Sequence, residues 1–232
     1  MSLFFTLLSV ILAYLISIPI AIKAAEKPHS SFDNWSSIAL FSLYSLPSFF
    51  LATLLLMTFS NPDVLPWLPA SGLMPSSGIP ENTGFWQRIQ IQAPYFILPL
   101  ICYTYSSLAF LSRSMRSALL ENLNLDYIRT ARAKGLSERV VLYKHAFKNA
   151  LLPMITLFAN VFPYAIGGSV VLESIFTLPG MGLETYTAIQ NQDYPVLVAV
   201  FTLTGCLALL GTLLSDILYA WVDPRISFSK NA

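Results

Sequence analysis

Five long stretches without a charged residue limit the possible folds of this chain more than any other feature of its sequence. Crossing the hydrocarbon core of a bilayer, about 30 Å thick, takes roughly 20 helical residues at about 1.5 Å per residue. A charge at mid-depth costs roughly 2.5 to 3.5 kcal/mol on insertion scales. Uncharged runs of this length are therefore typical of membrane-spanning helices. The five stretches are 1–22, 34–62, 89–112, 149–172 and 194–215.

The composition supports a membrane protein. Of the 232 residues, 55% are hydrophobic and 11% are charged, whereas about a quarter of a typical soluble domain is charged. This balance excludes an ordinary soluble protein and a disordered chain. The first stretch has no Lys or Arg before Lys23 and no small-residue cleavage site, so we interpret it as a spanning helix and not as a signal peptide. We predict an all-α protein with one transmembrane domain over residues 1–232, whose helices span about 3–22, 36–60, 90–112, 151–172 and 195–217.

The basic residues predict the orientation. Of the 13 Lys and Arg residues, only Arg88 lies in the second connection, and the others lie in the first and third connections or, as Arg225 and Lys230, after the last stretch. By the positive-inside rule that side is cytoplasmic. The carboxy terminus and the loop 113–150 are then cytoplasmic, and the amino terminus is outside. An odd number of helices with a bare outer terminus leads us to expect a further helix upstream of this chain.

The sequence offers no residues for catalysis or cofactor binding. Cys102 and Cys206 each lie in an apolar stretch, and His29 and His145 have no Cys or acidic partners at metal-ligand spacing. There is no G-x-x-x-x-G-K-[ST] phosphate loop, so any nucleotide would be bound by another polypeptide. No hydrolase motif or pair of carboxylates lies within a membrane stretch. We therefore expect no enzyme, no catalytic residue, no metal site and no cofactor bound by this chain.

The third connection, from Arg113 to Asn149, is longer than a tight turn between two helices requires. Asn124 or Asp126 can cap a helix that continues as YIRTARAK, and Gly135 can provide its left-handed end. Ser137 then caps a second helix, ERVVLYKHAFKNALL, which Pro153 bends into the next membrane stretch. The segment is predicted to be a cytoplasmic helix, a glycine turn and a second helix.

Two interpretations of this loop remain open. Its eight basic residues could set the membrane topology and touch anionic lipid. The small residues Ala131, Ala133 and Gly135, however, suit close docking against another protein, and this is the interpretation we favour. Nucleic acid is not an expected partner, because both ends of the loop are tied to membrane helices.

Two parts of the sequence resemble a known family. The run DYIRTARAKGLSERVVLYKHAFKNALLP resembles the EAA loop of inner-membrane permeases of ABC importers, in the branch that moves dipeptides, oligopeptides and nickel. The runs VLESIFTLPGMGLETYTAIQNQDYP and LLSDILYAWVDPRI are similar to the carboxy-terminal part of that branch. The resemblance implies the type I permease fold and a loop that couples to a separate ATPase. The coupling residues that it implies are Arg129, Thr130, Ala131, Ala133, Gly135, Leu136, Leu152 and Pro153.

The chain departs from the family pattern in two respects. Arg129 stands where the general motif has Glu, and the distance from Gly135 to Pro153 is longer than in sugar importers; both features resemble the peptide branch. Family members also usually have six helices and an external region after the first. The likeness here begins at the second helix.

The resemblance also implies an external gate near LPGMGLETYTAIQ, which has the pattern of a short amphipathic helix at the outer mouth. Glu173 ends the fourth membrane stretch and Asp193 can cap the fifth, so electrostatics at helix ends explain both acidic residues at least as well as a contact with substrate does. The gate candidates are Glu173, Pro179, Gly180, Gly182 and Asp193.

The function implied is that of a multi-pass subunit in the bacterial inner membrane that forms the translocation pathway by alternating access. Its expected partners are membrane lipid, a second and homologous permease subunit, two cytoplasmic ABC ATPase subunits that use ATP, and an extracytoplasmic solute-binding protein. The substrate could be a peptide, nickel or another solute. The alternatives are a secondary transporter or channel subunit that works without an ATPase, and an exporter or orphan subunit with the same fold.

Overall fold

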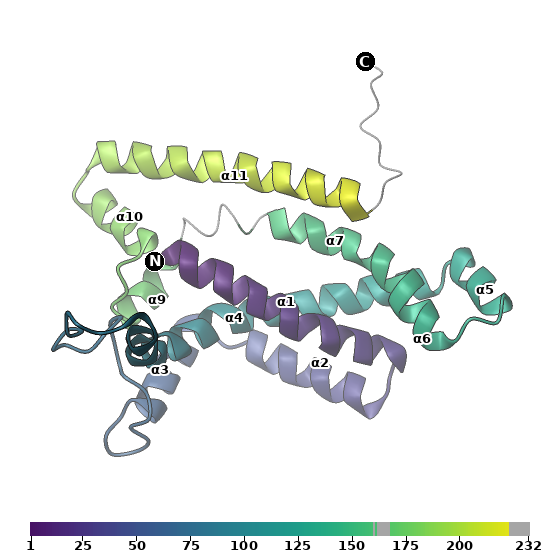
Figure 1. Cartoon of the computed structure of the whole chain (residues 1–232), viewed down its shortest axis with the longest axis horizontal. Helices are drawn as coiled ribbons and strands as arrows, with labels where there is room; N and C mark the ends of the chain where they lie inside the picture. Colours follow the sequence, from purple (N-terminus) through teal and green to yellow (C-terminus); the bar gives the residue numbers. More distant parts are fainter. Residues whose placement is uncertain (160, 162–167, 223–232) are drawn as a thin grey trace.

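The computed structural model describes residues 1–159, 161 and 168–222, and these residues contain helices and connections but no strand. Figure 1 shows the helices running mainly along the long axis of the molecule. The elements are α1 (Ser2–Glu26), α2 (Ser31–Tyr44), α3 (Ser48–Phe59), α4 (Phe85–Leu123), α5 (Asp126–Ala133), α6 (Glu138–Val140), the π-helical segment η1 (Val141–Ala146), α7 (Phe147–Ala159), α9 (Val170–Ile175), α10 (Met181–Gln190) and α11 (Tyr194–Val222). The predicted all-α class is confirmed.

Among the described residues, three helices are individually long and apolar enough to cross a membrane: α1, α4 and α11. The pair α2 and α3 adds a fourth candidate, although the two helices meet at an angle of 94°. The predicted helix 151–172 includes residues 160 and 162–167, which lie outside the described residues; α7 and α9 flank that gap.

The bend between α2 and α3 follows from Pro47, which precedes the first residue of α3. Proline has no N–H and disfavours the helical conformation of the residue before it. The expected continuous helix 36–60 is therefore broken in two. The carbonyl of Leu46 at the break accepts a hydrogen bond from the Tyr105 hydroxyl of α4, at 2.8 Å. This contact replaces a helical hydrogen bond in a region that offers no water.

The longest helix, α4, runs well beyond the predicted 90–112. It contains 39 residues, which corresponds to roughly 58 Å at about 1.5 Å per residue. The helix expected over 90–112 therefore continues into the predicted cytoplasmic segment 113–150, because charges end a membrane stretch without ending a helix. The following residues, RSMRSALLENL, are mostly strong helix formers. As a result α4 packs against α1, α2, α3 and α7 and forms the centre of the structure.

Two clusters of buried apolar side chains hold the helices together. The first, here called the α5 core, joins α1, α4, α5, η1 and α7, and includes Ala21, Met115, Leu119, Ile128 and Leu142. The second, here called the α9 core, joins α1, α3, α4 and α9, and includes Phe5, Ala52, Leu98, Leu172 and Phe176. The two cores lie toward opposite ends of the central helix.

The last helix, α11, packs against α7 and α10. Ser215 donates a hydrogen bond to the carbonyl of Ile155 at 3.2 Å, and the hydroxyls of Thr156 and Tyr219 are in contact. Much of the remaining surface of α11 is apolar and exposed, for example at Phe201, Leu209 and Trp221. Arg225 and Lys230, which were predicted to be cytoplasmic, lie outside the described residues.

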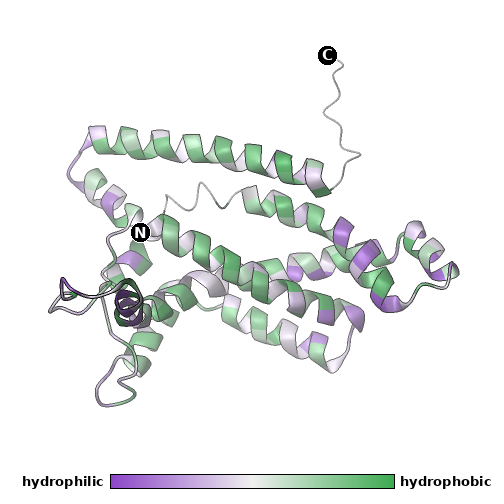
Figure 2. Ribbon diagram, viewed as in Figure 1, coloured by the Kyte–Doolittle hydropathy of each residue, from purple (hydrophilic) through white to green (hydrophobic). Residues whose placement is uncertain are grey.

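The polar and apolar parts of the chain are separated along its length. Figure 1 places α5, α6 and the turn between α1 and α2 at one end, and α9, α10 and the amino terminus at the other. Hydrophobic residues dominate the length of α1 and α11 in Figure 2, and hydrophilic residues gather toward the end that carries α5 and α6. We call the end with α5 the basic end and the opposite end the α9 end.

This arrangement leads to a prediction about topology. In a chain whose Cys102 and Cys206 are replaced by alanine, Ser137→Cys at the basic end will be shielded from an impermeant thiol reagent in intact cells. Ser76→Cys, in the connection between α3 and α4, will react, because the positive-inside rule keeps the basic end in the cytoplasm. Both positions are exposed, so both should react after permeabilisation. Equal labelling of the two variants in intact cells would contradict the orientation.

Candidate functional site

At the basic end, α5 ends in the glycine turn expected from the sequence. Gly135 has a φ of +78°, in the left-handed region, which confirms this expectation. Its N–H donates to the carbonyl of Arg132 at 2.9 Å, and the N–H of Leu136 donates to that of Ala131 at 3.4 Å. These two bonds are those of a Schellman motif, which satisfies carbonyls left open at a helix end.

The predicted caps at the beginning of these helices are not formed. Leu125 occupies the cap position of α5 and provides no side-chain hydrogen bond. Asn124 instead donates from its side chain to the carbonyl of Leu120, at the end of α4. Ser137 does precede α6, but its side chain makes no capping hydrogen bond. The first turn of α5 therefore relies on Asp126, whose charge favours the positive end of the helix dipole.

The small residues of α5 do not share one outward face. Ile128 and Ala131 are buried in the α5 core, while Ala133 and Gly135 are exposed. Successive residues of an α-helix are about 100° apart, so position 133 points away from the face that 128 and 131 occupy. The expected docking face that included Ala131 is therefore wrong: Ala131 packs within its own chain.

The exposed surface of this segment is partly apolar. Leu136, Val140 and Tyr143 are each more than a third exposed. Arg129 and Thr130 are exposed as well. We call the exposed side of this segment the loop surface; it consists of Arg129, Thr130, Ala133, Gly135, Leu136, Val140 and Tyr143.

Ion pairs stabilise the shape of the loop surface. Arg132 donates to both carboxylate oxygens of Glu138, at 2.8 and 3.1 Å, across the turn at Gly135. These hydrogen bonds hold the pKa of the exposed Glu138 below its usual range. Arg129 pairs with Asp126 one turn earlier at 3.2 Å. Exposed pairs of this kind contribute about 0–1 kcal/mol each, so they orient the turn more than they stabilise the fold.

The expected second helix is interrupted by η1. The π-helical segment covers Val141–Ala146, and α7 begins directly after it. Such segments are rare in proteins, and those that occur are often found at functional sites. Here η1 directs Val141, Leu142 and Ala146 into the α5 core. Leu152 and Pro153 follow inside α7, where Leu152 is half-buried and Pro153 is exposed.

At the α9 end, a buried carboxylate connects three distant segments. Glu173 is 1% exposed, and its two oxygens accept hydrogen bonds from the Ser2 hydroxyl and from the N–H of Leu183, each at 2.7 Å. The Ser2 hydroxyl in turn accepts the N–H of Met181 at 2.6 Å. Because Gly180 has no side chain to cap α10, Glu173 supplies the negative charge that the start of this helix favours.

Glycines make room for this carboxylate. A Cβ atom on Gly180 would overlap the carboxylate of Glu173, and one on Gly168 would meet both Glu173 and the backbone of Gly182. Gly168 also has a φ of +57°. The run LPGMG therefore needs glycine at its centre because the carboxylate lies directly against that backbone. We call this arrangement the Glu173 cradle; it consists of Ser2, Gly168, Glu173, Gly180 and Gly182.

The structure separates the gate candidates into two groups. Glu173, Gly180 and Gly182 come together in the cradle, with Pro179 exposed next to it. Asp193 lies beyond the far end of α10 and accepts the N–H of Val196 at 3.3 Å. This contact confirms the expected cap at the start of the last helix. Ser2 and Gly168 were not predicted, since nothing in the local sequence indicates that they meet Glu173.

A groove lined by hydroxyl groups lies beside the cradle. Its volume is about 610 Å³, and its lining comes from α1, α3, α4, α7, α9 and adjoining residues. No charged residue is found among the described residues that line it, and hydrogen-bonding groups come mainly from side-chain hydroxyls. Those hydroxyls belong to Thr6, Ser9, Tyr14, Ser48, Tyr103, Ser106, Ser107 and Ser169.

Comparisons with known proteins cover nearly the whole chain. Residues 17–228 match the family described as binding-protein-dependent transport system inner membrane component. The chain is 41% identical over 222 residues to the oligopeptide transport system permease protein AppB of Bacillus subtilis, covering 96% of this chain and 67% of that protein. It is 37% identical to the peptidoglycan transport system permease protein YejB of Agrobacterium fabrum, covering 95% of this chain and 60% of that protein. The inner membrane ABC transporter permease protein YejB of Escherichia coli O157:H7 is 34% identical, with 95% and 60% covered.

The packing of the Glu173 cradle leads to a prediction about stability. Gly180→Ala will lower the free energy of unfolding by about 1 to 3 kcal/mol, the usual cost of overpacking. The backbone at Gly180 is ordinary, with a φ of −111°, so the cost arises from the overlap with Glu173. Thermal unfolding in detergent measures the effect.

The matched control is Gly205→Ala on α11, where an added Cβ meets nothing within 4 Å. It should not lower the unfolding temperature and should raise it slightly, because alanine is a better helix former than glycine. Adding Glu173→Ala to Gly180→Ala should cost less than the sum of the two single changes, because the overlap is then gone. Strict additivity would contradict the cradle as the source of the effect.

Proposed function

The chain belongs to the family of binding-protein-dependent transport system inner membrane components, and on this premise we propose that it is a membrane-spanning subunit of an ATP-driven importer of peptides. The names of its relatives support the substrate class, since they include oligopeptide and peptidoglycan transport systems. The chain spans 60 to 67% of the length of these relatives. The activity of the whole relatives is therefore assigned to this chain only as part of this proposal.

The hydroxyl-lined groove forms one side of the translocation pathway. Serine, threonine and tyrosine hydroxyls can both donate and accept hydrogen bonds, which suits the alternating N–H and C=O groups of a peptide backbone. The absence of charge from the described lining means that no single ion pair holds the substrate. Weak and repeated contacts of this kind permit passage of peptides with different side chains.

The loop surface is the docking site for cytoplasmic ABC ATPase subunits, two in the complete importer, which bind and use the ATP. The observation that carries this proposal is that α5 is exposed on one side and locked into the α5 core on the other. Ile128 and Ala131 pack in the same core as Met115 of α4 and Met154 of α7. A displacement of α5 by the ATPase would therefore be transmitted to both membrane helices. Ala131 acts as an anchor of this lever, and Ala133 and Leu136 belong to its contact surface.

The Glu173 cradle holds the external gate. It connects the beginnings of α1 and α10 to α9, next to the groove that Ser169 and Leu172 help to line. Its hydrogen bonds are between a carboxylate and neutral donors, which can separate when the gate opens. Pro179 lies on the exposed side, toward the extracytoplasmic solute-binding protein, and Asp193 fixes the start of α11.

The exposed apolar side of α11 faces lipid or the second, homologous permease subunit, and the carboxy terminus lies in the cytoplasm.

A negative charge introduced on the loop surface tests the coupling role. Ala133→Glu will leave membrane abundance unchanged, because Ala133 is exposed. It will reduce co-purification of the ATPase, and ATP hydrolysis stimulated by the loaded binding protein, by at least about tenfold, which corresponds to roughly 1.4 kcal/mol of docking energy. Ala131→Glu will instead lower abundance, because it places a charge in the α5 core.

The matched control is Ala70→Glu, an exposed alanine in the connection between α3 and α4. This variant should bind and stimulate the ATPase normally. Normal stimulation in Ala133→Glu would remove the loop surface as the docking site. The alternative of a transporter without an ATPase would then take precedence.

The turn at Gly135 provides an independent test. An added Cβ at this position has no neighbour within 4 Å, so a substitution acts through backbone strain alone, at about 1 to 3 kcal/mol. Gly135→Val will reduce stimulated ATP hydrolysis while abundance stays normal. Gly135→Asn will retain most of it, because Asn tolerates the left-handed conformation. Equal activity of the two variants would show that the geometry of the turn does not matter for coupling.

A further inference from the structure

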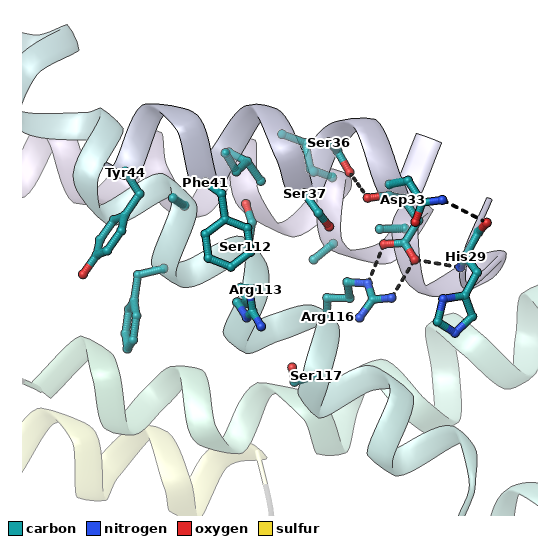
Figure 3. A pocket seen from close by; sticks show the side chains of 17 residues that line it. His29, Asp33, Ser36, Ser37, Phe41, Tyr44, Ser112, Arg113, Arg116 and Ser117 are labelled. Carbon is teal, nitrogen blue, oxygen red and sulfur yellow. Dashed lines mark hydrogen bonds and ion pairs between the residues drawn. The ribbon is translucent and has the colours of Figure 1, made fainter. Parts of the chain in front are cut away.

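A second cavity lies at the basic end, between α1, α2 and α4, and has a volume of about 390 Å³. Figure 3 shows polar side chains of α2 and α4 pointing toward one another across it. We call it the Arg113 pocket. It contains no residue of the loop surface or of the Glu173 cradle, and the function proposed above assigns no role to it.

One of its two arginines is neutralised within the chain. Asp33 is 2% exposed, and Arg116 donates to both of its carboxylate oxygens, from Nε and from Nη2, at 2.6 Å each. The N–H of His29 adds a third hydrogen bond at 2.8 Å. These contacts form a bidentate ion pair between Arg116 and Asp33. This pair connects α2 to α4 and leaves no net charge.

Arg113 lies one turn earlier on α4 and lines the same pocket. Its guanidinium lies over the ring of Phe41, 4.4 Å from the centroid. No acidic side chain among the described residues forms an ion pair with it. The pocket therefore carries a positive charge that the described part of the chain does not balance.

Ser112 gives a second and independent indication of a ligand. This residue is 3% exposed, and its hydroxyl has no hydrogen-bond partner among the described residues. A buried hydroxyl without a partner is unfavourable, because it has lost its hydrogen bonds to water without replacing them. Ser112 lines the pocket next to Arg113, and Ser37 and Ser117 add further hydroxyls. The pocket thus offers an unpaired guanidinium and several hydroxyl donors, a set that matches the oxygens of a phosphate group.

The remaining wall of the pocket is apolar. Phe41, Tyr44 and Phe110 line it and are each about half exposed. Arg113 directly follows the uncharged stretch 89–112, so the polar part lies at the depth of lipid headgroups and the aromatic part at the depth of the acyl chains. A ligand with an anionic head and an apolar tail fits both parts.

We propose that the Arg113 pocket binds one anionic phospholipid from the leaflet at the basic end, with its phosphate between Arg113 and Ser112 and an acyl chain along Phe41 and Phe110. Bound there, the lipid fills the space between α2 and α4 beside the pair Asp33–Arg116. Anionic lipids are enriched in the cytoplasmic leaflet, which agrees with the orientation predicted for this end.

The experiment uses the full chain, purified in detergent and titrated with dioleoylphosphatidylglycerol while its unfolding temperature is recorded. We expect a saturable rise, and a concentration for half-maximal effect that is at least about fivefold higher for Arg113→Gln. Dioleoylphosphatidylcholine should give less than half of the rise. The matched control is Arg139→Gln, because Arg139 also lies near an aromatic ring, Tyr143 at 5.9 Å, but outside the pocket. Its titration should equal that of the unchanged chain.

A second variant keeps the test decisive if Arg113→Gln does not fold. Ser112→Ala removes the unpaired hydroxyl without a change in charge, and should raise the half-maximal concentration about threefold while the chain folds normally. Two outcomes would overturn the proposal: equal titrations of all variants, or equal effects of the two lipids. Saturation by inorganic phosphate alone, with no further effect of phosphatidylglycerol, would assign the pocket to a free anion and also overturn the lipid assignment.

Discussion

The structure depends on one constraint: in the hydrocarbon core of a bilayer no water is available to satisfy polar groups, so the protein must satisfy them itself. This constraint explains why the described chain is helical and why its one sharp break is not left open. Where Pro47 ends the path of α2, the hydroxyl of Tyr105 donates to the freed carbonyl of Leu46. The two buried carboxylates follow the same requirement, since each has donors for both oxygens.

The two ends of the bundle satisfy their buried carboxylates by different means, and the difference agrees with their proposed roles. Asp33 is held by the charged fork of Arg116, which makes a strong and directional contact between α2 and α4. Glu173 is held by a hydroxyl and a backbone N–H. A gate has to open, and neutral donors release a carboxylate more readily than a guanidinium does. Between these ends, the α5 core gives the basic end a continuous apolar connection into α1, α4 and α7.

Several features were predictable because they depend on nearby residues or on the solvent. The helical class and the left-handed turn at Gly135 belong to this group, as does the cap that Asp193 forms for α11. Other expectations were wrong for physical reasons. Ala131 was assigned to an outward face because it is small, yet helical spacing places it beside Ile128 in the core. The helix expected over 90–112 instead continues to Leu123, because leaving the membrane does not end a helix.

The sequence by itself determined which stretches are free of charge, which connections are basic and where the helix before Gly135 must turn, because these follow from composition and local backbone preferences. The tertiary structure alone decided which side chains meet. Ser2 and Glu173 are separated by 171 residues and Asp33 and Arg116 by 83, and no local pattern links either pair. Their contacts result from the packing of α1, α2 and α3 around α4 and of α9 against α3 and α10. The hydroxyl groove, the Glu173 cradle and the Arg113 pocket exist only once those helices are assembled.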